Sequence, residues 1–208
     1  VKFISSPEVA QVAEIIKARL GRDLEPFDIW YDGFKVRSAI SEDELSAKTR
    51  ALYPNPAALK ADLPNIMQRL GFTKEKADEV CSKVEVDPSL GAGHAWGAMA
   101  TYDISRLRTR IAADGMDYKG YNIAVHEFGH NVEQTITMYD VDNYMMCGVP
   151  STAFTEALAF VFQKRDLPLL GYVTNDAHAS AYQMLDIFWG SYEIMGVSLV
   201  DIYTWRWL

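Results

Sequence analysis

The sequence predicts an α+β fold that is mainly helical, with a short sheet beside one long helix. Several stretches place apolar residues at helical spacing behind capping residues, residues 104–111 alternate with the period of a strand, and helical spacing then resumes. The length of 208 residues suits one domain, or a core with a helical appendage, and we expect one compact unit. Within it we expect a helical N-terminal part, residues 1–83, and a second part, residues 84–208, that carries the chemistry.

The first helix is expected to run from Pro7 to Leu20. Ser6 can cap it, a proline suits its first turn, and Gly21 can close it. The apolar residues of this stretch recur at helical spacing: Val9, Val12, Ile15, Ile16 and Leu20.

Three more helices are expected before residue 84. Residues 41–44 read Ser-Glu-Asp-Glu, which has the form of a capping box in front of a helix. Residues 57–70 resume the helical pattern, with Pro64 expected to interrupt it. Thr73 can cap a further helix that reaches about Val84. No residue in these helices suggests chemistry. They could form a lid, a wall of the fold or a partner surface, and we expect the wall.

Residues 84–120 change character. Residues 84–87 alternate, and residues 104–111 do so more clearly, with one face of Ser105, Leu107, Thr109 and Ile111 and another of Arg106, Arg108 and Arg110. We favour a strand, although Ala112 and Ala113 would also extend a helix. The arginines are expected to face solvent. A free edge of this strand could bind a peptide backbone by strand addition. His94 is expected to be structural, with substrate contact as the alternative.

The stretch from residue 167 to 171, Leu-Pro-Leu-Leu-Gly, is expected to end a helix. Asn175 and Asp176 can start another helix, which runs through His178 and Tyr182.

Composition excludes some partners and leaves others open. The formal net charge is −8, which argues against a nucleic-acid partner because such proteins carry a basic surface. No apolar run approaches the roughly 18 residues that a membrane span needs. The chain opens on Val1 and has no signal peptide, so we expect it to be cut from a longer protein, and its localisation stays open. Cys81 and Cys147 are expected to be buried free thiols.

The most informative motif is His126-Glu127-Phe128-Gly129-His130, which matches H-E-x-x-H. Two histidines four residues apart lie on one face of a helix, so both imidazoles can bind one Zn²⁺ ion. Glu127 projects beside the metal, where it can take a proton from a water that the metal activates. Asn122 is the expected N-cap of this helix.

Catalytic zinc uses three protein ligands, and the third must come from a separate element. We predict Glu156, because a carboxylate in the apolar helical stretch 152–162 is costly unless it has a strong partner such as a metal. Asp140 and Asp142 are closer in sequence but suit a helix end and a solvated loop. His178 is the remaining alternative and would give a three-histidine site.

With Glu156 at this distance from the H-E-F-G-H motif, the chain resembles the gluzincin metallopeptidases, most closely the thimet-oligopeptidase-like family. The likeness covers residues 121–160, including the glycine-containing segment that begins at Gly148 and ends in Glu156. It implies a zincin-like core and zinc-dependent hydrolysis of peptide or protein substrates. Two departures stand out: Glu133 replaces a histidine that those enzymes usually have, and they are several times longer.

Peptide hydrolysis also needs a donor for the oxyanion. In the thimet-like enzymes, tyrosines and a histidine on a downstream Gly/Tyr-rich segment supply it. Tyr192 resembles the first of those tyrosines, and His178 or Tyr182 is an alternative donor. The other positions are not matched, because Asp186, Gly196 and Leu199 stand there.

The expected function is therefore zinc-dependent peptide hydrolysis, with His126, His130 and Glu156 as ligands and Glu127 as general base. Two alternatives stay open at this point. One is a non-catalytic binding domain that keeps the same scaffold, and the other is a zinc hydrolase with a non-peptide substrate. Oligomeric state and substrate sequence are not predicted by any of these residues.

Overall fold

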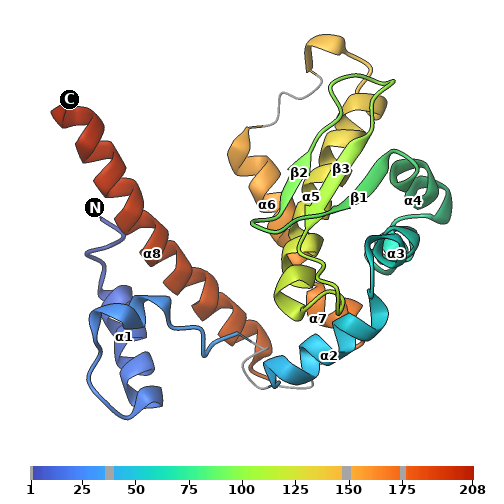
Figure 1. Ribbon diagram of the computed structural model, residues 1–208. Coiled ribbons are helices and arrows are strands. Elements are labelled where there is room, and N and C mark those ends of the chain that lie inside the picture. Colours follow the sequence, from blue (N-terminus) through green and yellow to red (C-terminus); the bar gives the residue numbers. More distant parts are fainter. Residues whose placement is uncertain (1, 36–39, 147–150, 174–176) are drawn as a thin grey trace. The chain divides into compact units, whose positions relative to one another are not determined.

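The computed structural model describes residues 2–35, 40–146, 151–173 and 177–208, and the chain forms two compact units (Figure 1). Unit 1 combines Val1–Ile40 with Thr174–Leu208, and unit 2 is Ser41–Val173. This division differs from the one expected at residues 83 and 84. The helices between residues 42 and 81 contact the sheet or the helix that carries the H-E-x-x-H motif, so they belong to unit 2.

Unit 2 contains the predicted sheet, which has three strands in the order β1-β3-β2. β1 (Val84–Pro88) runs parallel to β3 (Ser105–Thr109), and β2 (His94–Trp96) runs antiparallel to it. The alternation of residues 105–109 is confirmed as a strand, with Ser105, Leu107 and Thr109 buried and Arg106 exposed. The expectation that this strand offers a free edge is wrong, because β3 is paired on both sides.

The long helix α5 (Tyr118–Asp140) packs against β2 and β3 and against α6 (Thr152–Gln163). In Figure 1, α6 lies alongside α5. Asp117 is the N-cap of α5 and accepts a hydrogen bond from the Gly120 N–H at 2.6 Å. The prediction of Asn122 as N-cap is therefore wrong, because the helix starts one turn earlier.

The wall of unit 2 consists of α2 (Glu42–Leu52), α3 (Pro56–Arg69), α4 (Lys74–Cys81) and the short α7 (Asp166–Leu169). A single-turn 3₁₀ helix, η3 (Tyr144–Met146), follows α5. The predicted caps Ser41 and Thr73 accept backbone N–H bonds from Glu44 and Lys76.

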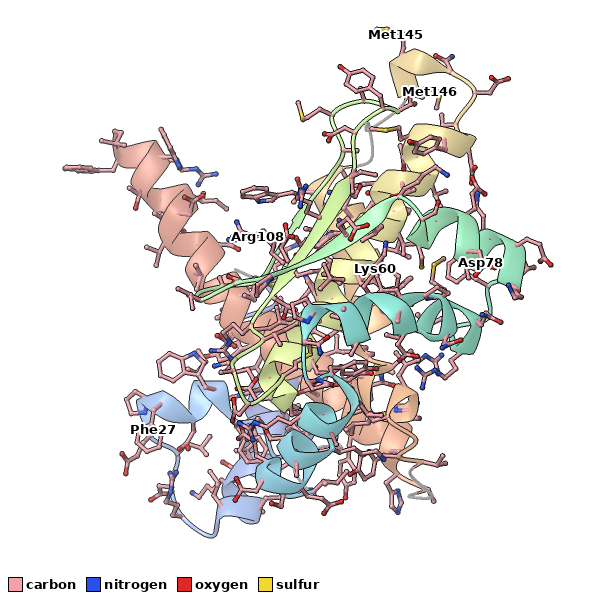
Figure 2. The ribbon with its side chains drawn as sticks, turned by 45° about the vertical axis from the view of Figure 1, so that its right-hand side comes forward. Phe27, Lys60, Asp78, Arg108, Met145 and Met146 are labelled. Atoms are coloured by element: carbon pink, nitrogen blue, oxygen red, sulfur yellow. The ribbon has the colours of Figure 1, made fainter. Side chains whose placement is uncertain are left out.

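The predicted interruption of α3 at Pro64 is wrong, because the helix continues through it. Leu63, Ile66 and Met67 flank the proline and are buried, so packing on both sides offsets the missing hydrogen bond. Helix α4 ends at Cys81, earlier than the expected Val84. Lys60 of α3, labelled in Figure 2, holds this end of α4. Its Nζ donates to the carbonyls of Cys81 and of Val84, the first residue of β1.

Cys81 is buried, as predicted, and burial raises the pKa of its thiol to about 12. Such a thiol is protonated and unreactive near neutral pH. Cys147 lies outside the described residues.

Unit 1 is built from α1 (Pro7–Leu20), η1 (Pro26–Trp30) and α8 (Ala179–Trp207). The bounds of α1 are as predicted, and Gly21 closes it with a left-handed φ of 67°. The core joins apolar residues of the two ends of the chain: Val9, Val12, Ile16, Phe34 and Trp189. The predicted helix start at Asn175 and Asp176 lies outside the described residues, and α8 begins after His178.

No helix in the described ranges combines the length and apolar character that crossing a membrane requires.

Candidate metal centre

Helix α5 presents the two predicted histidine ligands from successive turns. The ring centroids of His126 and His130 lie 4.9 Å apart, with the rings at 81° to each other. Both side chains are mostly buried, with 15% and 13% of their surface exposed. This burial restricts their rotamers, so the two Nε2 atoms are held ready for a common partner.

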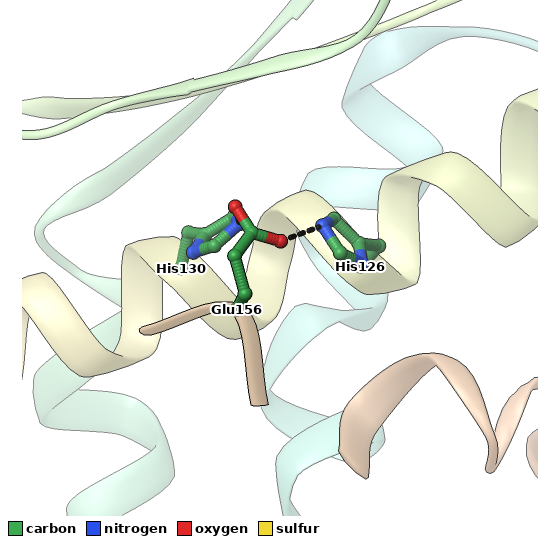
Figure 3. A group of neighbouring side chains, drawn as sticks. All are labelled: His126, His130 and Glu156. Carbon is green, nitrogen blue, oxygen red and sulfur yellow. Dashed lines mark ion pairs between the residues drawn. The ribbon is translucent and has the colours of Figure 1, made fainter. Parts of the chain in front are cut away.

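Helix α6 supplies the third group. The Glu156 carboxylate points at both imidazoles (Figure 3), with Oε2 3.4 Å from His126 Nε2 and Oε1 3.4 Å from His130 Nε2. Within the described parts of the chain, these three residues form the metal-type group, and their ligand atoms all lie within 4.8 Å of one another. The structure therefore brings together the three predicted ligands.

Gly129 of α5 explains how α6 comes close enough to α5 for Glu156 to reach the two histidines. A Cβ atom on Gly129 would lie 2.8 Å from the Cα of Ala159 and 3.3 Å from the Cβ of Phe162. Gly129 thus lets the backbones of α5 and α6 meet, with Ala159 one turn after Glu156 on α6. The glycine inside the H-E-F-G-H motif therefore sets the spacing on which the third ligand depends.

The donor set fits zinc. Two imidazole nitrogens and one carboxylate are a known ligand set of catalytic zinc, and bonds of about 2.0–2.1 Å in a tetrahedron place donor atoms about 3.3 Å apart. Each imidazole Nε2 lies 3.4 Å from a different oxygen of the Glu156 carboxylate, and ligand atoms taken one from each residue all lie within 4.8 Å of one another, so the three groups are close enough to share one ion. Calcium and magnesium prefer all-oxygen sites, so a first-row transition metal is the better fit.

Glu127 lies between the two histidines on α5 and is partly buried. The residue before β2, Gly93, passes close to it, since a Cβ there would lie 3.4 Å from the Glu127 Cγ. The proposed general base therefore stands where the metal helix meets the start of the edge strand β2. His94 follows in that strand with an exposed side chain.

The structure also identifies a residue that sequence reasoning missed. Gln163, the last residue of α6, places its side-chain Oε1 3.1 Å from the Nδ1 of His126. Its position seven residues after Glu156 puts it on the same face of α6, two turns along. That spacing is the available indication, but a side-chain amide is not one of the usual zinc ligands, so the residue type alone does not single out Gln163.

The rival ligands take other positions. Asp140 ends α5 and pairs with Lys76, whose Nζ lies 2.6 Å from its Oδ2. Asp142 is exposed in the coil that follows. Glu133, which stands where the thimet-like enzymes carry a histidine, is buried and accepts a hydrogen bond from the Thr137 hydroxyl at 2.7 Å.

The oxyanion candidates Tyr192, His178 and Tyr182 belong to unit 1, whereas the three predicted metal ligands belong to unit 2. Tyr192 lies on α8 and packs its ring 5.1 Å from that of Trp189. His178 immediately precedes α8, with its ring 6.3 Å from that of Tyr182. Their part in catalysis stays a prediction.

Comparisons of this chain with family models, with curated proteins and with solved structures found no match.

Proposed function

We propose that this chain is a zinc-dependent metallopeptidase of the gluzincin type, which hydrolyses peptide bonds with water. One observation carries the proposal: an H-E-x-x-H helix and a glutamate of a second helix converge so that three ligand atoms surround one point. Such a group leaves a fourth position open, which is typical of catalytic rather than structural zinc.

His126, His130 and Glu156 would hold the ion. When bound, zinc polarises the scissile carbonyl and lowers the pKa of a water toward neutrality. The chain itself must then move one proton. Glu127 accepts it as the water oxygen bonds to the carbonyl carbon, and donates it to the nitrogen as the C–N bond breaks. Tyr192 or His178 remains the proposed donor to the oxyanion.

The edge of the sheet supports a peptide as substrate. Among the described strands, β2 pairs only with β3, so its other side can accept an extended chain. Its first residue, His94, follows the glycine that passes beside Glu127. A peptide added to β2 would therefore run past the general base.

The test combines metal analysis with cleavage of a peptide library. The purified chain is expected to carry about one zinc per molecule, and His130→Ala is expected to lose it. Glu127→Gln is isosteric and removes no ligand, so it should keep the zinc and lose about 10²–10⁴-fold in hydrolysis. Cleavage by Glu127→Gln at the wild-type rate would exclude Glu127 as the base. A zinc-loaded wild-type chain that cuts no peptide would point to a non-peptide substrate or to a binding domain.

A further inference from the structure

A chain of side-chain hydrogen bonds leads away from the metal centre into the core of unit 2. It starts at His126 Nδ1, which lies 3.1 Å from Gln163 Oε1. The Gln163 Nε2 donates to Asn122 Oδ1 at 2.7 Å, and the Asn122 Nδ2 donates to Asp166 Oδ2 at 2.6 Å. Three helices contribute, because the residues lie on α5, α6 and α7.

At the Asp166 end of this series of hydrogen bonds, the direction of donation is fixed. Asp166 is buried, with 7% of its surface exposed, and its carboxylate also accepts hydrogen bonds from the Tyr118 hydroxyl and the Leu167 N–H. An ionised carboxylate can only accept, and a buried one must be satisfied by donors. The Asn122 amide therefore has to turn its NH₂ group toward Asp166.

The direction of donation at Asp166 then determines the direction of each following hydrogen bond. Because the Asn122 NH₂ group faces Asp166, the Asn122 oxygen faces Gln163. The Gln163 NH₂ group must therefore donate to that oxygen. The Gln163 oxygen is left facing His126 Nδ1, and an oxygen without a hydrogen can only accept. Nδ1 consequently carries the imidazole proton, and Nε2 presents a lone pair toward Glu156 and the metal position.

We infer that Gln163, Asn122 and Asp166 are positioning residues that hold His126 in the tautomer that can bind a metal. This role deepens the proposed function and rests on it. Partners of a metal-binding histidine commonly fix its ring and tautomer, and losing one typically costs about 10–100-fold in metal affinity. Here a pair of neutral amides, Asn122 and Gln163, links Asp166 to His126 through three successive hydrogen bonds, each with its direction of donation fixed.

Zinc affinity of the full chain, measured by competition with a chelator, gives the first readout. Gln163→Leu removes the acceptor at Nδ1 and is expected to raise the Kd for zinc about 10–100-fold. Gln163→Glu restores an acceptor at that position and should bring the Kd back near the wild-type value. Gln68→Leu is the matched control, because Gln68 is exposed on α3 and bonds only locally to the Pro64 carbonyl. An unchanged Kd in Gln163→Leu would overturn the inference.

The second readout needs no metal and separates this inference from the proposed function. In metal-free Glu156→Ala protein no carboxylate faces Nε2, so ¹⁵N NMR of the neutral His126 ring reports what Nδ1 contacts. We expect the Nδ1–H tautomer there, and a shift toward Nε2–H, which free imidazole side chains favour, when Gln163→Leu or Asp166→Asn is added. Finding Nε2–H with the chain of hydrogen bonds intact would overturn the inference, even if wild-type protein binds zinc and cuts peptides. Failure of the wild-type protein to bind zinc would instead contradict the proposed function.

Discussion

Glu156 shows how a single side chain depends on its partner. It stands on an apolar helix, yet 45% of its side chain is exposed and its two oxygens face two imidazoles. Without a cation, the carboxylate would face the lone pair that His126 Nε2 presents in the tautomer inferred above. A bound metal converts this unfavourable arrangement into three coordinate bonds, which is the physical reason to regard the residue as a ligand.

Glu156→Ala is therefore expected to weaken zinc binding strongly, whereas His178→Ala should leave it almost unchanged. Zinc content after gel filtration and the Kd from chelator competition measure both variants. The opposite result, with His178→Ala losing the metal, would indicate a three-histidine site. The gluzincin assignment would then fail, and the zinc-hydrolase interpretation of His126, Glu127 and His130 would survive.

At the scale of elements, the contact between α5 and α6 brings Glu156 to the two histidines. The Cβ that Gly129→Ala adds must displace the α6 backbone, because it would lie 2.8 Å from the Cα of Ala159. Overpacking of this kind typically costs about 1–3 kcal/mol. Since α6 also carries Glu156, its displacement should raise the Kd for zinc as well.

Gly196→Ala is the control for this change, because it makes the same substitution inside helix α8. A Cβ at Gly196 meets nothing within 4 Å, so alanine should stabilise the helix by up to about 1 kcal/mol. In thermal unfolding, Gly129→Ala should lower the midpoint temperature and Gly196→Ala should raise it slightly. In zinc titration, the Kd should rise in Gly129→Ala and stay unchanged in Gly196→Ala. Equal behaviour would mean that the close approach of α5 and α6 is not needed.

The turn between α1 and η1 carries a pH dependence. Arg22 donates two hydrogen bonds to the Asp28 carboxylate, at 2.7 and 2.8 Å, and the Glu25 N–H donates a third at 2.6 Å. The guanidinium first, and the backbone N–H second, hold the pKa of Asp28 below its usual range. The stabilisation is therefore present above the unfolded-state pKa of about 3.9 and is lost as the pH falls through the lower folded-state pKa.

We expect Asp28→Asn to destabilise unit 1 near neutral pH and to flatten its loss of stability in acid. Trp189 is a reporter for this, because its indole N–H donates to the Asp28 carbonyl at 3.2 Å. Tryptophan fluorescence followed through an acid titration of both proteins measures the difference. Identical acid transitions would show that Asp28 contributes nothing to the pH dependence.

At the scale of the whole molecule, metal binding and the candidate oxyanion donors are divided between the two units. The three ligands, Glu127 and the hydrogen-bond chain to Asp166 all belong to residues 41–173, whereas His178 and Tyr192 belong to unit 1. Unit 2 has its own sheet, its own helical wall and a core of its own. Metal binding should therefore need unit 2 alone.

A chain of residues 41–173 is expected to bind zinc with a Kd close to that of the full chain. It should lose most of its peptide hydrolysis if Tyr192 or His178 supplies the oxyanion donor. Circular dichroism establishes that the shorter chain is folded before zinc binding and cleavage are compared. A folded chain of this length without zinc would contradict the assignment of the site to unit 2, and full cleavage would exclude both donors.

The sequence by itself determined the features that depend on local spacing. Helix α1 with its glycine stop, the alternation of residues 105–109 and the pairing of His126 with His130 follow from periods of 3.6 and 2. The place of Glu156 beside both imidazoles agrees with its predicted distance from the motif, but the burial expected for it is not found, because 45% of its side chain is exposed. The continuation of α3 through Pro64 could not be predicted, since it depends on burial of residues around it.

Only the tertiary structure decided which distant segments meet. It joined the two ends of the chain in unit 1, placed β3 at the centre of the sheet with β2 as an edge strand, and set Gln163 against His126. Asn122 changed from an expected helix cap to a member of the hydrogen-bond chain, because the helix begins one turn earlier at Asp117. These outcomes depend on packing between elements far apart in sequence, and no local period encodes that packing.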